Sequence, residues 1–179
     1  LYQKPDDNFD YMYVDHIAGM KMAAKHLLDK GCRDIVLLTG DINEQTSYER
    51  ADGYMCALEE NGLDYDPGKV INGSYRMDKT YEAFGRYLDK GGKIDGVIAS
   101  NDLSGYGILR VCNERGFRIP GDIRLVSFDN TDYAITAQPS FTSVDMRQFF
   151  IGQHAARILL ERIQGRRKVS NVILQPELI

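Results

Sequence analysis

The clearest signal for the fold lies in Val97–Asn130, which reads VIASNDLSGYGILRVCNERGFRIPGDIRLVSFDN. It contains two short apolar runs, 97–99 and 123–128, that bracket a segment with helical periodicity. The apolar residues of that segment recur at every third position: Tyr106, Leu109 and Cys112. Apolar runs on both sides of an amphipathic helix predict a β-α-β unit, whose two strands lie parallel. We therefore expect a parallel sheet covered by helices.

Short polar residues follow both apolar runs. Ser100, Asn101 and Asp102 come after the first run, and Asp129 and Asn130 come after the second. In open parallel sheets, ligands bind at the edge where the strands have their carboxyl ends. We interpret Asp102 as the N-cap of the following helix, because its carboxylate can accept the free amide hydrogens of the first turn. This interpretation leaves Asn101 as the stronger candidate for a ligand contact.

Strands and helices alternate along the rest of the chain. Further strands are expected at residues 9–14, 35–38, 70–71 and 172–174. Further helices are expected at residues 16–30, about 47–61, 79–90 and 149–164. The second of these helices is expected to bury the side chains of Tyr48, Ala51, Met55 and Leu58. Residues 131–140 are interpreted as a loop, and the polar segment 1–8 as a lead-in. The alternation predicts an α/β fold with a doubly wound parallel sheet.

The composition is that of a globular protein. The 179 residues are 43% hydrophobic and 27% charged, and no run of eighteen apolar residues or charged-then-apolar leader occurs. We therefore expect a cytoplasmic protein without a membrane span. A net charge of −4 argues against strong binding of nucleic acid by this chain itself. The compact basic run 165–168 follows an expected helix end, where cations are stabilised by the helix dipole, and this interpretation is favoured over a phosphate site.

No pattern for metal binding or catalysis is present. The cysteines are odd in number and widely spaced: Cys32, Cys56 and Cys112. The histidines are scattered and have no partner at ligand spacing: His16, His26 and His154. The GxG at 105–107 lacks the third glycine of a dinucleotide site, and no Walker lysine or nucleophile elbow occurs. We expect no metal, no cofactor, no catalytic residue and no enzymatic activity.

Several linked strings carry a family resemblance. They are Ile98–Asp102, Gly107–Arg110, Gly116–Ile123, Val126–Asn130, Arg50 with Gly53-Tyr54, and Gln138–Val144. At these separations they resemble the effector-binding core of the LacI/GalR family of bacterial transcription regulators. A typical member joins a helix-turn-helix head to a two-lobed body similar to periplasmic sugar-binding proteins. The resemblance implies that this chain is mainly the second lobe, and that operator DNA is contacted only through a head that is not visible here.

The resemblance also implies a division of the chain. Residues 1–13 are expected to be a linker and remnant of the first lobe, and residues 14–145 the second lobe. Residues 146–170 form a helical segment that crosses to pack on the first lobe in the family, and residues 171–179 form a closing strand. An apolar helix without its usual sheet needs cover, so we expect it to dock on this lobe or on a neighbouring chain.

Four residues match positions that the family uses for effector contact: Arg50, Tyr75, Asn101 and Asp129. Their chemistry suits a small polyhydroxylated effector, because a carboxylate accepts hydroxyl hydrogens, a guanidinium offers a planar fork of donors and an aromatic ring covers a sugar face. By family, a sugar or sugar phosphate is the expected ligand class, and a nucleobase stays open.

Each candidate also has a structural alternative. Asp129 could cap the turn that follows its strand. Arg50 could form an ion pair with Glu49, Asp52 or another carboxylate on the helix surface. Tyr75 could pack in the core or on the surface like the other tyrosines.

The chain departs from the family pattern beside the expected site. Ser127 stands where the family has Gly, and Met146 and Gln148 stand where it usually has Gln and Phe. Three functions fit this architecture: the effector-sensing lobe of a regulator, a periplasmic-type sugar-binding protein of a transport system, and an enzyme. The resemblance favours the regulator, and in that family the helix after Asp102 lies at a homodimer interface.

Overall fold

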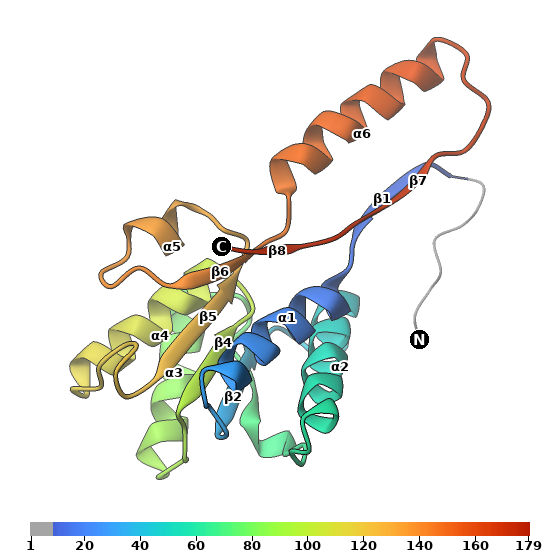
Figure 1. Ribbon diagram of the computed structural model, residues 1–179. Helices are drawn as coiled ribbons and strands as arrows, with labels where there is room; N and C mark the ends of the chain where they lie inside the picture. Colours follow the sequence, from blue (N-terminus) through green and yellow to red (C-terminus); the bar gives the residue numbers. More distant parts are fainter. Residues whose placement is uncertain (1–8) are drawn as a thin grey trace.

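The computed structural model describes residues 9–179, so the expected lead-in at 1–8 lies outside the described residues (Figure 1). The strands are β1 (Tyr11–Val14), β2 (Ile35–Thr39), β3 (Val70–Asn72), β4 (Gly96–Ala99), β5 (Arg124–Phe128), β6 (Thr142–Asp145), β7 (Asn171–Leu174) and β8 (Glu177–Leu178). The α-helices are α1 (His16–Asp29), α2 (Gln45–Glu60), α3 (Met77–Asp89), α4 (Asp102–Glu114), α5 (Asp132–Thr136) and α6 (Gln148–Ile163). A short 3₁₀ helix, Pro67–Lys69, precedes β3.

The main sheet has six strands in the order β3-β2-β4-β5-β6-β8. Strands β3, β2, β4, β5 and β6 pair in parallel, and β8 runs antiparallel to β6. The segment Val97–Asn130 supplies β4, α4 and β5 at the centre of this sheet. The predicted α/β fold with a doubly wound, mainly parallel sheet is confirmed.

Helices cover both faces of the sheet. Helices α1 and α2 pack on one face around Met20, Tyr54 and Phe128, and α3 and α4 pack on the other around Phe84 and Ile108. These five side chains are at most 1% exposed, and burying a large apolar side chain stabilises a fold by about 1.5–3 kcal/mol. Cys112, on the apolar side of α4, is also buried, with 0% exposure. Tyr48 was expected to be inward but is 50% exposed, because it lies one position outside the stripe that faces α1.

Three segments differ from the sequence-based expectation. The first is β6, where no strand was predicted. The loop at 131–140 contains the short helix α5, which buries Ala134. The closing segment 171–179 contributes two strands instead of one. Strand β7 pairs with β1 in a separate two-stranded parallel sheet, and β8 is the strand that closes the edge of the main sheet.

Helix α6 projects from the lobe together with β1 and β7 (Figure 1). Ile158 is its buried residue, and Ile151 packs in part against the core. Four large apolar side chains of α6 are more than half exposed: Phe149, Leu159, Leu160 and Ile163. The helix therefore docks on this lobe only through a narrow strip, and most of its apolar surface is uncovered within the described chain.

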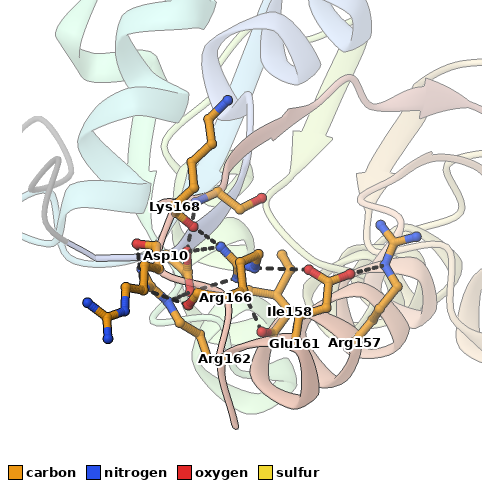
Figure 2. A network of polar contacts seen from close by, with 9 residues as sticks. Asp10, Arg157, Ile158, Glu161, Arg162, Arg166 and Lys168 are labelled. Carbon is orange, nitrogen blue, oxygen red and sulfur yellow. Dashed lines mark hydrogen bonds and ion pairs between the residues drawn. The ribbon is translucent and has the colours of Figure 1, made fainter. Parts of the chain in front are cut away.

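An ionic cluster around Asp10 holds this projecting part together (Figure 2). The Asp10 carboxylate accepts hydrogen bonds from Arg162 Nε at 2.7 Å, from Arg166 Nη2 at 3.0 Å and from the Ser170 amide at 2.7 Å. These two guanidinium groups lower the pKa of Asp10. Arg166 Nη2 also donates to the Ile158 carbonyl of α6 at 3.2 Å, which ties the segment after the helix back to it.

Candidate functional site

The candidate site lies at the edge of the sheet where the parallel strands have their carboxyl ends. Arg50 lies near the start of α2, and Tyr75 lies in the turn between β3 and α3. Asn101 is the second residue after β4, and Asp129 directly follows β5. These strands are neighbours in the sheet, so residues that follow them meet at one edge. The structure therefore brings the four predicted residues to the same end of the lobe.

Arg50 is the centre of this group and is 4% exposed. Its Nη1 donates a hydrogen bond to the Ser100 carbonyl, and its Nη2 lies 3.5 Å from His16 Nδ1. The guanidinium carbon lies 4.5 Å from the centre of the Phe128 ring and 5.9 Å from that of Tyr75. Burial lowers the pKa of Arg50, and the nearby Tyr75, Asp129 and Glu49 raise it in part. The expected alternative, an ion pair on its own helix, is not formed among residues 9–179.

Tyr75 is fixed by close contacts. Its hydroxyl lies 2.7 Å from Ser47 Oγ, and its ring lies against the backbone of Gly40, just after β2. A Cβ atom on Gly40 would come within 2.0 Å of the Tyr75 ring, so glycine is needed there. Tyr75 itself has a φ of 54°, a left-handed conformation. These contacts place the ring over the end of β2, beside Arg50.

Asn101, not Asp102, is the N-cap of α4, so the sequence-based interpretation of this pair was wrong. Asn101 Oδ1 accepts the Ser104 amide at 2.8 Å, and its Nδ2 donates to the Tyr75 carbonyl at 3.0 Å. Amides and carboxylates cap helices equally well, so the choice between the two neighbours is set by the surrounding structure. Asn101 thus ties the Tyr75 turn to α4 and keeps one amide N–H that these two bonds do not use.

Asp102 is buried, with 1% exposure, and its carboxylate accepts hydrogen bonds from β5, from β6 and from the turn after β5. Its Oδ1 accepts hydrogen bonds from the hydroxyls of Ser127 and Ser143, the latter at 2.8 Å. Its Oδ2 accepts the amide of Thr131 at 2.6 Å and the hydroxyl of the same residue at 2.7 Å. The turn after β5 is therefore capped by Asp102 and not by Asp129, which was the structural alternative for Asp129.

Asp129 is left with its carboxylate at the edge. Its φ is 101° and that of Asn130 is 50°, so the chain turns sharply there in the left-handed region. Burial raises the pKa of Asp129, and Asp102 adds to this, whereas Arg50 and a hydrogen bond with Gln148 lower it. Within residues 9–179 the Asp129 carboxylate has the Arg50 cation nearby but forms no ion pair, so it can accept hydrogen bonds from a ligand.

Sequence reasoning missed two residues of this edge, His16 and Glu49. His16 contacts Arg50, and burial lowers its pKa to about 4, so its imidazole is neutral at pH 7. Glu49, 2% exposed, accepts hydrogen bonds from the Tyr13 hydroxyl at 2.5 Å and from Gln45 at 2.9 Å. The position of His16 after the first strand was the available signal, whereas nothing in the pattern of α2 marked Glu49 as buried.

Buried polar atoms without hydrogen-bond partners gather at this edge in the part of the chain that the structure describes. They are Thr39 Oγ1, at the end of β2, Ser100 Oγ, after β4, and Arg50 Nε. An unsatisfied buried polar group typically costs about 1–3 kcal/mol, so such atoms favour a bound polar molecule. Within residues 9–179, no group of His, Cys, Asp and Glu side chains could hold a metal ion, and no helix is long and apolar enough to cross a membrane.

Comparison with known proteins identifies the family. A model of the periplasmic binding protein-like domain matches residues 24–179. The transcriptional regulator CelR of Thermobifida fusca is 34% identical over 161 residues, covering 90% of this chain and 47% of that protein. The repressor PurR of Haemophilus influenzae is 28% identical over 179 residues, covering 98% of this chain and 53% of that protein. The chain thus spans about half the length of these relatives.

Solved structures agree with this assignment. A CelR–cellobiose complex matches with a TM-score of 0.91 at 31% identity, covering 99% of this chain and 55% of that one. A LacI family regulator from Enterococcus faecium with bound ribose matches with a TM-score of 0.90 at 26% identity, covering 99% and 66%. The chain therefore belongs to the periplasmic binding protein-like family, and it corresponds to the effector-binding part of LacI-type transcriptional regulators.

Proposed function

We propose that this chain is the second lobe of the ligand-sensing domain of a LacI-type regulator and binds a sugar or sugar phosphate between itself and a first lobe. The observation that carries the proposal is the environment of Arg50. This buried guanidinium has a carbonyl, an imidazole and two aromatic rings around it. In the part of the chain that the structure describes, it forms no ion pair and its Nε–H has no hydrogen-bond partner. Burying a charge without full pairing is costly unless a ligand supplies the missing partners.

The other residues of the edge suit the same ligand. Asp129 can accept hydrogen bonds from two hydroxyl groups, and the Tyr75 ring can cover the apolar face of a pyranose. Asn101 keeps one N–H donor beside its capping role. Similar regulators have been solved with cellobiose, with ribose and with phosphate, which supports a sugar or sugar phosphate for this chain as well.

Binding acts on the regulator through the two lobes. A ligand held by both lobes favours the closed arrangement, and it shifts the equilibrium by the difference between its affinities for the closed and open forms. We place the first lobe on the uncovered apolar side of α6, where Leu159 and Ile163 are exposed. The change would reach operator DNA through a DNA-binding head outside this sequence, in a cytoplasmic protein. The similar proteins are regulators, which favours this class over an exported sugar-binding protein.

A homodimer contact through α4 completes the proposal. A groove between α3, α4 and α5 is lined by Met77, Tyr106 and Leu109. Apolar side chains around it are exposed, with Ile135 at 64% and Tyr133 at 49%. We expect Ile135→Asp to weaken self-association in analytical ultracentrifugation. A sedimentation profile equal to that of the wild type would contradict this surface.

A thermal-shift screen tests the ligand class. The regulator containing this chain is heated with cellobiose, ribose, glucose 6-phosphate and a purine base, alongside its Asp129→Ala variant. A ligand present at 100 times its Kd stabilises the folded protein by about 2.7 kcal/mol, which raises Tm by a few degrees. We expect a sugar or sugar phosphate to raise Tm of the wild type and to leave the variant unchanged. Equal stabilisation of both proteins would place the ligand elsewhere.

A further inference from the structure

The turn that presents Asp129 is strained. Asp129 and Asn130 both have positive φ, at 101° and 50°, and two consecutive non-glycine residues in this region persist only when the surroundings hold them. The Asp129 amide donates to the Val144 carbonyl at 2.9 Å, and the Asn130 amide donates to Ser143 Oγ at 3.0 Å. These two hydrogen bonds attach the turn to β6. The position of the Asp129 carboxylate therefore depends on the remaining hydrogen bonds of the residues beside it.

One buried carboxylate makes the other attachments. Asp102 accepts hydrogen bonds from Ser127, two residues before Asp129, and from Thr131, two residues after it. It also accepts the hydroxyl hydrogen of Ser143, whose oxygen in turn receives the Asn130 amide. All of these donors are neutral, so the four hydrogen bonds and the amino-terminal position of Asp102 on α4 stabilise its charge.

We propose that Asp102 is a positioning residue for the effector site: its buried carboxylate clamps the chain on both sides of Asp129 and so fixes the turn that aims the Asp129 side chain at the ligand. The proposal rests on the proposed function in taking Asp129 as a ligand contact, but the clamp itself exists without a ligand. Ser127 is part of the clamp, and it stands at a position where the LacI/GalR pattern has glycine, which has no hydroxyl to donate.

The test is nuclear magnetic resonance on the ligand-free chain, comparing the wild type with Asp102→Asn. The exposed carboxylate of Asp132, one residue beyond the clamp, gives the matched control Asp132→Asn. Hydrogen bonds to charged groups contribute about 1.5–3 kcal/mol, so we expect amide exchange at Asn130 and Thr131 to accelerate about tenfold or more in Asp102→Asn. Exchange in β2 and β4 and in the control should be unchanged.

The carboxyl pKa of Asp129 gives a second readout. The groups that set it are Arg50 on α2, Asp102 on α4 and Gln148 on α6, besides burial. Removing the negative charge of Asp102 and exposing the loosened turn both lower the pKa of Asp129, so we expect it to fall in Asp102→Asn. Thr131→Val keeps the charge and removes one donor. Thr131→Val should accelerate amide exchange in the turn, but it should not produce the fall in the Asp129 pKa that comes from removing the charge of Asp102. This variant replaces Asp102→Asn in the test if Asp102→Asn does not fold.

Two results would overturn the proposal. One is unchanged amide exchange at positions 130 and 131 in both Asp102→Asn and Thr131→Val. The other is acceleration spread evenly over the whole chain, which indicates loss of global stability without a local clamp. Because no ligand is present, either result is distinct from a failed ligand screen, which bears on the proposed function alone.

Discussion

Substituting Gly40 by alanine tests the packing that positions Tyr75. The new Cβ would lie 2.0 Å and 2.6 Å from two Tyr75 ring carbons and 2.7 Å from Ser47 Oγ. Carbon atoms pack best at about 3.5–4.0 Å, so the ring must move by about 1.5 Å or more. Its own φ of 54° and its hydrogen bond to Ser47 limit that movement. Overpacking of this kind costs about 1–3 kcal/mol, and we expect Gly40→Ala to lower the free energy of unfolding by that amount.

Urea denaturation of a double-mutant cycle measures this cost. In a Tyr75→Ala background the clashing ring carbons are gone, so Gly40→Ala should cost less than about 1 kcal/mol and the coupling energy should be about 1–2 kcal/mol. Gly152→Ala on α6 is the control, because a Cβ there meets nothing within 4 Å. It should stabilise by about 0.5–1 kcal/mol through helix propensity. An equal cost of Gly40→Ala in both backgrounds would refute the contact between Tyr75 and Gly40.

Three further outcomes are expected. Arg50→Met removes a buried cation and fills similar space, so it should change the free energy of unfolding by less than about 1 kcal/mol but abolish effector binding. Urea denaturation measures the first effect and titration calorimetry the second. Retained affinity for the effector would contradict the role of Arg50. Burial lowers the pKa of His16 from 6.5 to about 4, so the unfolded chain binds the proton first and stability should fall as the pH drops from about 6.5 to 4. His16→Gln should reduce this fall in urea denaturation across that range, and an unaltered pH profile would count against a buried neutral imidazole. Asp10→Asn should accelerate amide hydrogen exchange in β1 and β7 but not in β2 or β4, because Asp10 joins Arg162 and Arg166 to Ser170. An equal acceleration in all four strands would show that the ionic cluster does not stabilise this part locally.

The central part of the fold was predictable because its signals are local and strong. Strands β2, β4 and β5 are buried on both faces and read as continuous apolar runs, and the helices between them have clear periodicity. The partners of β7 and β8 were not predictable, because these strands have four and two residues and pair with segments far away in sequence. Helix α5 has only five residues, too few for a periodic pattern.

The candidate site was predictable to the level of its edge but not of its hydrogen bonds. Residues that follow parallel strands must meet at one end of the sheet, which placed Asn101 and Asp129 correctly. The roles of Asn101 and Asp102 were exchanged, since either side chain can cap a helix and the choice depends on donors from β5 and β6. Whether Arg50 forms an ion pair also depends on tertiary packing, here on the rings of Tyr75 and Phe128.

The most direct test of the effector site is a crystal structure of the regulator with the sugar or sugar phosphate that stabilises it in the thermal screen. We expect the ligand between the two lobes, with its hydroxyl groups within hydrogen-bonding distance, about 2.5–3.2 Å, of the Asp129 carboxylate and the Arg50 guanidinium. The Tyr75 ring should lie against the ligand. A ligand bound at another surface, with Arg50 and Asp129 making only the contacts described above, would contradict the site.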